Sequence, residues 1–496
     1  MSQSYRISNE GLLNRNKEIS FKFNGKKYTG YEGDTLASAL LANGVHLVGR
    51  SFKYHRPRGF FGAGVDEPNA KLQIQLNGHS EPNVNATEFE LVEGIEATSQ
   101  NCWPSVEFDV GAINNFLNKF FPAGFYYKTF MWPKSFWYKI YEPFIRKAAG
   151  LGVASIEKDK ERYEHKYEYC DLLVAGSGPA GLSSAYAAAK NGAKVILAED
   201  KPRFGGSLLT DEVTIDNLSG KAWADKIINE LKEMPNVLVK SRSQVFGYYD
   251  HNMTVMFERT GDHLENKPKY TPRQRLWYIR AKEVLLSTGS IERPIVFGNN
   301  DTPGIFLSAA AKEYIKVYGV LVGKKPLIFT NNDSAYETAL EFKKQGIDPI
   351  ILDTREEHSS ELIETAKNQN IKIKFSYAVI AANGYKKVKS AQIGKLNKDK
   401  TAFENSETIE CDCICVSGFW TPTVHLASQS GNKLKFNDQI DAFVPDKSKQ
   451  NETSVGASKG TFTLKETLDD GFKTGFNLSK KITNNSKATS TPNSNE

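Results

Sequence analysis

The sequence predicts an α/β protein in which a small β-rich domain precedes two Rossmann-like units. Three observations support this fold class. Residues 172–200 and 323–353 each show a buried strand, a loop, a helix and a second buried strand in that order. Residues 18–80 instead show strand-like patterns with a hairpin signal. The length of 496 residues allows about two to four domains.

Composition limits the class of function. The chain is 40% apolar and 25% charged, which is typical of a soluble globular protein. Its 64 basic and 58 acidic residues give a net charge of +6, too small an excess to indicate nucleic-acid binding. The sequence shows neither an apolar signal-peptide core nor a run of about 18 apolar residues, so we expect a cytoplasmic protein without a membrane partner. The odd, sparse set of five cysteines suits a reducing compartment.

The β-rich N-terminal region shows turn and cap signals. Asn24-Gly25 predicts a hairpin, and the following helix is expected to begin near Asp34 or Thr35 and to end at Gly44. Residues 71–76, KLQIQL, alternate as a half-buried strand does.

An aromatic-rich segment follows over residues 108–144. Four lysines interrupt it, so it is not a membrane span: Lys119, Lys128, Lys134 and Lys139. The segment is either an interface or a packed connector between domains, and the connector is favoured because aromatic side chains mostly serve burial. We expect this connector over residues 101–166.

The first Rossmann-like unit carries a glycine-rich loop, Gly176-Ser177-Gly178-Pro179-Ala180-Gly181, between strand 172–175 and a helix of small residues. Gly176 permits a tight turn, Gly178 lets the backbone approach a pyrophosphate, and Gly181 lets the helix pack close to the sheet. The helix N-terminus supplies N–H groups and a partial positive charge for the phosphates. The pattern therefore predicts a dinucleotide site.

Three further features extend this site. The second strand, 195–198, ends in Glu199, where a carboxylate can accept hydrogen bonds from ribose hydroxyls. Strand 284–286 runs into Ser287-Thr288-Gly289, a tight turn of the kind that closes over a bound dinucleotide. Residues 455–460 precede a helix expected over Thr463–Gly475 and resemble the late glycine motif of two-domain flavoproteins.

The second Rossmann-like unit lacks the glycine loop. Its first strand is expected over Lys325–Phe329, and Thr330-Asn331-Asn332-Asp333-Ser334-Ala335 stands where the glycines belong. Side chains at 330 and 332 should crowd a pyrophosphate. The second site is therefore predicted to be degenerate or altered in its ligand.

Three of the five cysteines form the run Cys411-Asp412-Cys413-Ile414-Cys415. Alternate thiols on a strand face one way, but no His or further Cys cluster stands nearby to complete a tetrahedral metal site. We interpret the run as a buried strand and expect no metal site. The absence of CxxC argues against a thioredoxin-reductase-type redox centre.

Five motifs together make the chain resemble a known family over about residues 18–480: GRSFKYHRPRG (49–59), EATSQNCWPS (96–105), PAGFYYKTFMWP (122–133), GSGPAGLSSA (176–185) and STGSIERP (287–294). The chain resembles the alpha subunit of heterotetrameric sarcosine oxidase. The wider group includes alpha subunits of amine- and opine-oxidising complexes.

The resemblance implies a [2Fe–2S] ferredoxin-like, β-grasp fold for residues 18–100. A cluster needs four cysteine thiolates, and no cysteine precedes Cys102, so we expect no iron–sulfur cluster. A basic group in this domain forms either a solvated loop or a contact for a subunit or a phosphate: Arg50, Lys53, His55, Arg56 and Arg58.

The resemblance also implies NAD in the first dinucleotide site, with FAD as the alternative occupant. In the family, the flavins that carry out the chemistry are FAD, in the beta subunit, and FMN at the alpha–beta boundary. Glu199, Asp200 and Lys201 match the family's acidic–acidic–basic ribose run. The residues expected to bind the cofactor are Gly176, Gly178, Pro179, Ala180, Gly181, Glu199, Asp200, Lys201, Gly206, Ser207, Val245, Thr288, Gly289, Gly456 and Ala457.

We place the first dinucleotide domain, which is pyridine-nucleotide-disulfide-reductase-like, at residues 167–322 and 411–482. The second unit is expected at 323–410 and a polar, disordered tail at 483–496. Family alpha subunits usually continue into a folate-binding, aminomethyltransferase-like half. We therefore interpret the chain as a shortened or split alpha subunit, or as a member of a shorter amine-dehydrogenase type.

The leading hypothesis is a dinucleotide-binding subunit of a sarcosine oxidase complex. This hetero-oligomer would oxidise sarcosine to glycine and formaldehyde with O₂ as acceptor. Its partners would be a flavin-carrying beta subunit, together with further small subunits. The alternatives are a self-contained FAD-dependent NAD(P)H oxidoreductase and a scaffold subunit without a redox role. We identify no catalytic residue in this chain, whose task would be to bind and position cofactors.

Overall fold

The computed structural model describes residues 3–76, 78–120, 124, 130–148, 150–483 and 492–495. Parts of the expected connector at 101–166 and most of the expected tail at 483–496 lie outside the described residues. The chain forms two compact units. One contains residues 1–159 and 292–419, and the other contains residues 160–291 and 420–496.

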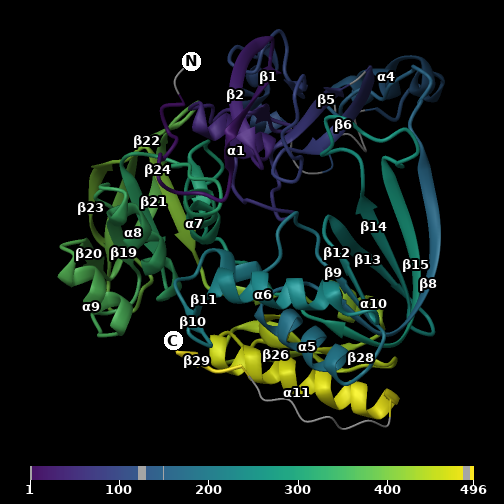
Figure 1. The fold of residues 1–496 in the computed structure, drawn as a ribbon. Helices are drawn as coiled ribbons and strands as arrows, with labels where there is room; N and C mark the ends of the chain where they lie inside the picture. The colour runs from purple at the N-terminus through teal and green to yellow at the C-terminus, as the bar shows by residue number, and fades with distance from the viewer. Residues whose placement is uncertain are drawn as a thin grey trace. The chain divides into compact units, whose positions relative to one another are not determined.

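The first unit begins with a five-stranded sheet and one buried helix (Figure 1). The hairpin prediction is confirmed: Asn24 and Gly25 take φ of 48° and 77° between the first two strands. Helix α1 (Leu36–Ala42) starts at Thr35, whose hydroxyl accepts from the Ser38 N–H in a capping box. In order across the sheet, the strands are β2 (Lys26–Glu32), β1 (Asn14–Phe23), β7 (Glu96–Ser99), β5 (Lys71–Leu76) and β6 (His79–Asn85).

Short elements follow this sheet. Strands β3 (Gly49–Arg50) and β4 (Pro57–Arg58) form a small antiparallel ribbon. The described part of the aromatic segment contains only short helical turns: η1 (Val110–Ala112), α2 (Ile113–Phe116), η2 (Asn118–Phe120), η3 (Lys134–Phe136), η4 (Trp137–Tyr141) and α4 (Glu142–Ala148).

The rest of the first unit is the second Rossmann-like fold. Its parallel sheet consists of β17 (Ile305–Leu307), β24 (Cys413–Ser417), β18 (Pro326–Thr330), β19 (Ile350–Asp353) and β20 (Lys372–Phe375). The helices are α7 (Ser308–Lys316), α8 (Ser334–Lys344) and α9 (Glu361–Asn368). An antiparallel sheet shares its core: β21 (Tyr377–Gly384), β22 (Val388–Leu396) and β23 (Phe403–Glu410).

Sheet pairing places the domain boundaries differently from the sequence analysis. Strands β17 and β24 hydrogen-bond in the second sheet, so residues 292–322 and 411–419 lie with the second Rossmann-like fold and not with the first. The three cysteines of the run are buried as interpreted, but only Cys413 and Cys415 lie in strand β24, and Cys411 precedes it. In the described part of the chain, no group of three or more His, Cys, Asp or Glu side chains is arranged to hold a metal ion.

The other unit, residues 160–291 and 420–496, contains the Rossmann-like fold that comes first in the chain, the one with the glycine-rich loop. Its main sheet runs β12 (Val237–Lys240), β9 (Val195–Ala198), β8 (Tyr163–Ala175), β15 (Gln274–Leu286), β14 (Met253–Arg259) and β13 (Ser243–Tyr249), with β28 (Glu452–Ser454) paired to β15. Helices α5 (Pro179–Lys190), α6 (Gly220–Glu233) and α11 (Leu464–Thr483) lie together in Figure 1 and bury one face of this sheet. Trp277 and Met256 belong to the core on the other face, with α10 (His425–Gln429).

The remaining elements of the two units are short. They are η5 (Gly206–Leu209), β10 (Thr214–Ile215), β11 (Leu218–Ser219), β16 (Ser290–Glu292), β25 (Trp420–Pro422), β26 (Lys433–Asn437), β27 (Ala442–Lys447), η6 (Gly456–Lys459) and β29 (Ser494–Asn495). Strand β29, within the tail expected to be disordered, pairs with β10. No helix of the described residues is long and apolar enough to cross a membrane.

Candidate dinucleotide site

In the glycine-rich loop of the first Rossmann-like fold, two positions leave no room for a side chain. Gly176 takes φ of 101°, and a Cβ there would lie 2.3 Å from the Ser287 carbonyl oxygen. A Cβ on Gly181 would lie 2.0 Å from the Gly176 carbonyl oxygen. Any larger residue at these positions would push apart the loop, β15 and α5.

Gly178 is different, because its missing side chain faces open space. It is the N-cap of α5 with φ of −66°, and a Cβ there would meet no atom within 4 Å. No side chain caps α5, and Pro179 occupies its first turn. The first-turn N–H groups therefore face an open approach, the arrangement that suits a phosphate.

Gly206 and Ser207 lie beside this approach. The Gly205 N–H donates to the Ser177 carbonyl oxygen at 3.1 Å and ties the segment to the glycine loop. Gly206 takes φ of 55°, and a Cβ there would come within 2.9 Å of the Gly178 Cα. Both residues are exposed, so their backbone and the Ser207 hydroxyl are available to a ligand.

Glu199 lies buried at the end of β9 and is bound to the glycine loop. Its Oε2 accepts from the Ser177 N–H at 3.0 Å and from the Ser177 hydroxyl at 2.5 Å. Its Oε1 accepts from the Lys201 N–H at 3.1 Å. Burial, and next the neighbouring Asp200, raise the pKa of Glu199 above its ordinary value. The predicted ribose acceptor thus also organises the loop.

The other predicted positions line the same edge of the sheet. The Ser243 N–H donates to the Glu199 carbonyl oxygen at 2.7 Å, which brings the start of β13, and half-buried Val245, next to β9. After β15, the Thr288 hydroxyl donates to the Thr423 carbonyl oxygen at 3.0 Å. Gly289 takes φ of 72°, and a Cβ there would meet no atom within 4 Å.

The late glycine motif contacts α5 directly. Gly456 takes φ of 65°, and a Cβ there would lie 2.8 Å from the Ala180 Cβ. The Gly456 N–H donates to Asp470 Oδ2 at 2.8 Å, which fixes the turn that carries Ala457 to α11.

The sequence analysis missed the residues that let α11 approach α5. A Cβ on Gly471 would lie 2.3 Å from the Ala180 carbonyl oxygen, and a Cβ on Gly475 would lie 2.3 Å from the Ser184 carbonyl oxygen. The Ser183 hydroxyl donates to the Leu468 carbonyl oxygen at 2.9 Å across the same contact. The available signal was the spacing of two glycines four residues apart in a helix, which places both on one face.

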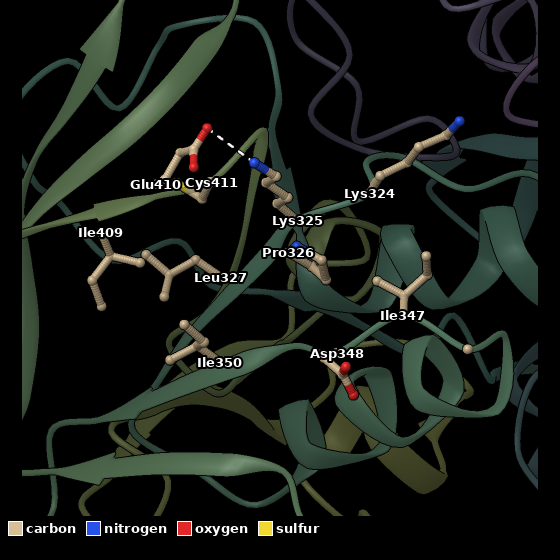
Figure 2. Close-up of a pocket in the computed structure, with 11 residues that line it drawn as sticks. Lys324, Lys325, Pro326, Leu327, Ile347, Asp348, Ile350, Ile409, Glu410 and Cys411 are labelled. Atoms are coloured by element: carbon tan, nitrogen blue, oxygen red, sulfur yellow. Dashed lines mark ion pairs between the residues drawn. The ribbon is translucent and has the colours of Figure 1, made fainter.

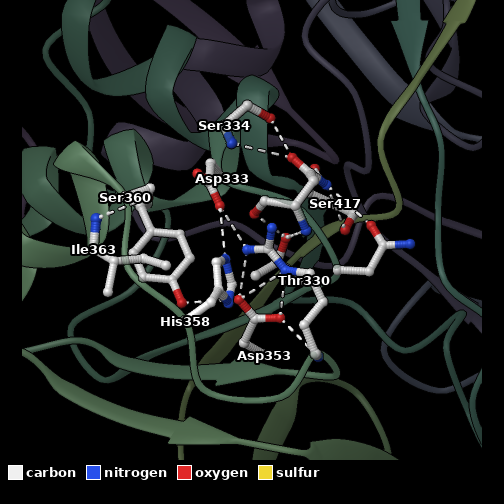
Figure 3. Close-up of polar contacts among 12 residues, drawn as sticks. Thr330, Asp333, Ser334, Asp353, His358, Ser360, Ile363 and Ser417 are labelled. Atoms are coloured by element: carbon white, nitrogen blue, oxygen red, sulfur yellow. Dashed lines mark hydrogen bonds and ion pairs between the residues drawn. The ribbon is translucent and has the colours of Figure 1, made fainter. Parts of the chain in front are cut away.

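In the second Rossmann-like fold, side chains occupy the place of the glycine loop (Figure 3). Buried Asn332 donates to the Ser417 hydroxyl at 3.0 Å, and its oxygen accepts from the Ser334 N–H at 3.1 Å. The Thr330 hydroxyl accepts from the Asn332 N–H at 3.0 Å. The Asn332 side chain thus takes up the first N–H of α8, where a pyrophosphate would need exposed backbone.

An ion cluster lies next to this loop. Arg355 binds Asp333 at 2.6 Å and the buried Asp353 at 2.7 Å (Figure 3). The Tyr336 hydroxyl donates to Asp353 Oδ2 at 2.9 Å. Although burial opposes it, hydrogen bonds from Ser360 and Arg355 lower the pKa of Asp333. A carboxylate therefore stands at the start of α8, where it would repel an anionic ligand.

A cavity of about 370 Å³ lies at the opposite edge of the same sheet (Figure 2). Its lining includes Lys324, Leu327 and Ile350, and Lys325 pairs with Glu410 across it at 2.9 Å. These residues lie at or before the amino ends of their strands, whereas dinucleotides bind at the carboxyl ends of such sheets. The cavity is therefore separate from the altered loop.

Most of the basic group of the N-terminal domain makes internal contacts. Arg50 donates to the Val106 carbonyl oxygen at 2.6 Å. His55 Nδ1 lies 2.7 Å from Asp109 Oδ2. Arg56 binds Asp301 at 2.6 Å, and Arg58 binds the other oxygen of the same carboxylate. These contacts give the group a structural role within the first unit.

The buried Glu67 carboxylate organises the neighbouring loop. Its Oε2 accepts from the N–H groups of Phe61 at 2.6 Å and Gly62 at 2.8 Å. Its Oε1 accepts from those of Asn69 at 2.6 Å and Ala70 at 3.1 Å. Four backbone donors from both sides of the loop thus converge on one side chain.

Comparison with known proteins supports the resemblance. The alpha subunit of sarcosine oxidase from Rhizobium meliloti (strain 1021) is 44% identical over 94% of this chain and 46% of its own length. An opine oxidase subunit of Agrobacterium tumefaciens (strain Ach5) is 24% identical over 56% of this chain and 58% of its own length. The chain spans about half the length of the curated relatives it matches.

A solved structure shares the fold. L-proline dehydrogenase from P. horikoshii superposes with a TM-score of 0.64 at 19% identity, covering 97% of this chain and 76% of that chain. The α/β fold class with Rossmann-like units after a small β domain is therefore confirmed.

The N-terminal domain requires a correction. Residues 16–102 match the 2Fe-2S iron-sulfur cluster binding domain family, which contradicts our prediction of a cofactor set without an iron–sulfur cluster. The donor set of this chain does not fit ordinary ligation by four thiolates, because the matched residues contain one cysteine, Cys102. Burial raises the pKa of the Cys102 thiol to about 11. No step of the function is assigned to a cluster.

The second family match covers the dinucleotide fold. Residues 170–455, more than half of the chain, match the family described as pyridine nucleotide-disulphide oxidoreductase. This range includes the glycine loop, Glu199 and the Thr288-Gly289 turn. The chain belongs to the pyridine nucleotide-disulphide oxidoreductase family.

Proposed function

We propose that this chain is the dinucleotide-binding subunit of a complex that oxidises sarcosine. The observation that carries the proposal is the open approach at Gly178 to the uncapped N-terminus of α5. The similarity to a sarcosine oxidase alpha chain over 94% of the sequence supports the amine as substrate. The altered loop at Asn332 leaves the first site as the better of the two for a dinucleotide.

Within this proposal, each part of the site has one task. The pyrophosphate lies on the glycine loop and the start of α5, beside Gly206 and Ser207. Glu199, Asp200 and Lys201 hold the ribose, and Val245 lies on the adenine side. Residues after two strands close the site: Thr288, Gly289, Gly456 and Ala457. A bound dinucleotide, NAD or FAD, supplies hydride-transfer chemistry, and this chain binds and orients it.

The overall reaction of the proposed complex converts sarcosine, water and O₂ into glycine, formaldehyde and hydrogen peroxide. We assign the flavin that accepts electrons from the amine to a partner subunit, and we assign no proton transfer to a residue of this chain. A self-contained FAD-dependent oxidoreductase is the alternative that the family itself favours.

Gly178→Ala tests the proposal, because the new methyl group fits the protein but enters the ligand's path. The variant should fold normally and lose at least about tenfold of the nucleotide that the wild type releases on denaturation. Gly49→Ala is the control, since a Cβ there meets one atom at 3.9 Å, outside the loop. Full nucleotide retention by Gly178→Ala would refute the site.

Mass spectrometry of the released nucleotide distinguishes NAD from FAD. A flavin absorbance near about 450 nm in the isolated chain would favour the self-contained oxidoreductase. Release of NAD from a colourless chain that turns over sarcosine only with its partners would support the proposed subunit.

A further inference from the structure

The aromatic segment, defined here as the described residues 103–120 and 130–148, is exposed. Its large side chains include Trp103 at 71%, Phe116 at 85%, Trp132 at 82% and Tyr138 at 83% exposure. The packed connector that the sequence favours is not what the structure shows. Exposed apolar surface on this scale marks an interaction site rather than ordinary surface.

Part of this segment is folded on itself and does not hang loosely. The Tyr141 ring lies 5.4 Å from the ring of Phe130 and 6.1 Å from that of Phe136, measured between centroids. The Tyr141 hydroxyl donates to the Trp132 carbonyl oxygen at 2.8 Å. The rings of Phe130, Phe136 and Tyr141 and the bond to the Trp132 backbone thus give this part of the segment a defined shape.

The charge of the segment identifies the kind of partner. Over the described residues of the segment, five basic side chains stand against three acidic ones. Of the acidic side chains, Asp109 is buried and binds His55, Glu142 pairs with Arg146 at 3.1 Å, and Glu107 is exposed. The structure shows no ion pair in the described residues for the four other basic side chains, which are exposed: Lys119, Lys134, Lys139 and Lys147. A surface of lysines and aromatic rings is complementary to an apolar face rimmed by carboxylates.

Two other occupants fit less well. A second copy of this chain would place lysines against lysines in a self-complementary contact, which costs free energy. An anionic membrane surface is bound by amphipathic helices with one long apolar face. Helix α2 spans four residues, and the longer helical run over residues 134–148 changes from a 3-10 turn to a π turn to α4, so it does not present one regular apolar face.

We infer that the aromatic segment docks an acidic, apolar face of a different polypeptide. The inference rests on the proposed function in one respect, that this chain works within a multi-subunit complex. The structure adds the location of the contact and the charge of the partner.

Zero-length carbodiimide cross-linking tests the inference, because it joins lysine amines to carboxylates in direct contact. The complex is purified from its native source through a tag on this chain, cross-linked and digested. Lys119, Lys134, Lys139 or Lys147 should be joined to aspartate or glutamate of a different polypeptide. The exposed Lys226 and Lys398 serve as control lysines and should be joined far less often.

A charge-reversal pair provides the second arm. Lys134→Glu with Lys139→Glu should weaken association with that polypeptide by about tenfold, while nucleotide content and thermal unfolding stay unchanged. Lys226→Glu with Lys398→Glu is the matched control and should leave association intact.

The outcomes separate the inference from the proposed function. A co-purifying polypeptide that is cross-linked only elsewhere overturns the inference and leaves the subunit role standing. Cross-links between two copies of this chain overturn it in favour of self-association. If no other polypeptide co-purifies, both fail. Salt-sensitive binding to vesicles of phosphatidylserine and phosphatidylcholine, lost in Lys134→Glu/Lys139→Glu, would then assign the surface to a membrane.

Discussion

Replacing Glu67 by glutamine should destabilise the loop of the N-terminal domain that Glu67 holds together. The carboxylate accepts four backbone N–H groups, two on each oxygen. Glutamine keeps one of the two side-chain oxygens, and its NH₂ group would face two of the four backbone N–H groups, which would then lack an acceptor. Each buried N–H left without an acceptor costs about 1–3 kcal/mol. Burial raises the pKa of Glu67 while the four donors oppose that rise, so removing the charge recovers part of the cost.

The expected loss is therefore about 3 kcal/mol, or about a hundredfold in the opening equilibrium of the loop. Hydrogen exchange measured by mass spectrometry reports this equilibrium at the amides of Phe61, Gly62, Asn69 and Ala70. Their protection should fall about a hundredfold in Glu67→Gln. Glu93→Gln is the control, because exposed Glu93 accepts a single backbone N–H, from Ser20 at 2.8 Å. Protection that changes less than about twofold in Glu67→Gln would refute the argument.

Three more predictions concern the Rossmann-like folds. Burial raises the pKa of Glu292 to about 7, so the folded state holds a proton that the unfolded state releases above about 4.5. The contribution of this group to the free energy of unfolding is present at low pH and is lost as pH rises through about 7. Between pH 4.5 and 8, the free energy of unfolding of the wild type should therefore fall by about 3 kcal/mol relative to that of Glu292→Gln. Denaturation measurements in which the two proteins depend on pH in the same way would contradict this. Gly471→Ala should lower the unfolding temperature by several degrees, because its methyl group would meet the Ala180 carbonyl oxygen at 2.3 Å. Gly346→Ala is the comparison variant, because its methyl group would strain the backbone at a turn but would contact no atom within 4 Å. Glu199→Ala should reduce nucleotide retention at a cost of about 1–3 kcal/mol, and unchanged occupancy on nucleotide release would exclude Glu199 as a ligand group.

The strand–loop–helix geometry of the first Rossmann-like fold could be predicted from the sequence, because its motif is short. The motif itself is local: Gly176, Gly178 and Gly181 stand within six residues, and Glu199 follows the next strand, although the atom that excludes a Cβ at Gly176 is the distant Ser287 carbonyl oxygen. The same local reasoning located Asn332 as the residue that replaces a glycine. Whether these residues bind a dinucleotide stays a prediction.

The features that the sequence did not predict depend on distant parts of the chain or on other molecules. Strand β24 joins the second sheet through hydrogen bonds to β17 and β18, about a hundred residues away, and the cysteine pattern holds no signal of that choice. The aromatic segment has the composition of a core, and composition alone does not reveal that many of its aromatic side chains are exposed. Glu67 was not singled out because a lone carboxylate in a loop usually faces solvent.

The contact between α5 and α11 has a consequence for biosynthesis. Ser183 and Leu468 are 285 positions apart, and residues 292–419 of the other unit are made between them. The glycine loop leaves the ribosome long before the helix that must pack against it. During synthesis, the nascent first Rossmann-like fold therefore exposes the face of α5 that packs on α11 until residues 464–483 have been made. This interval makes the unfinished chain a natural client of chaperones, and a chain truncated before residue 456 would lack the surface that closes the fold.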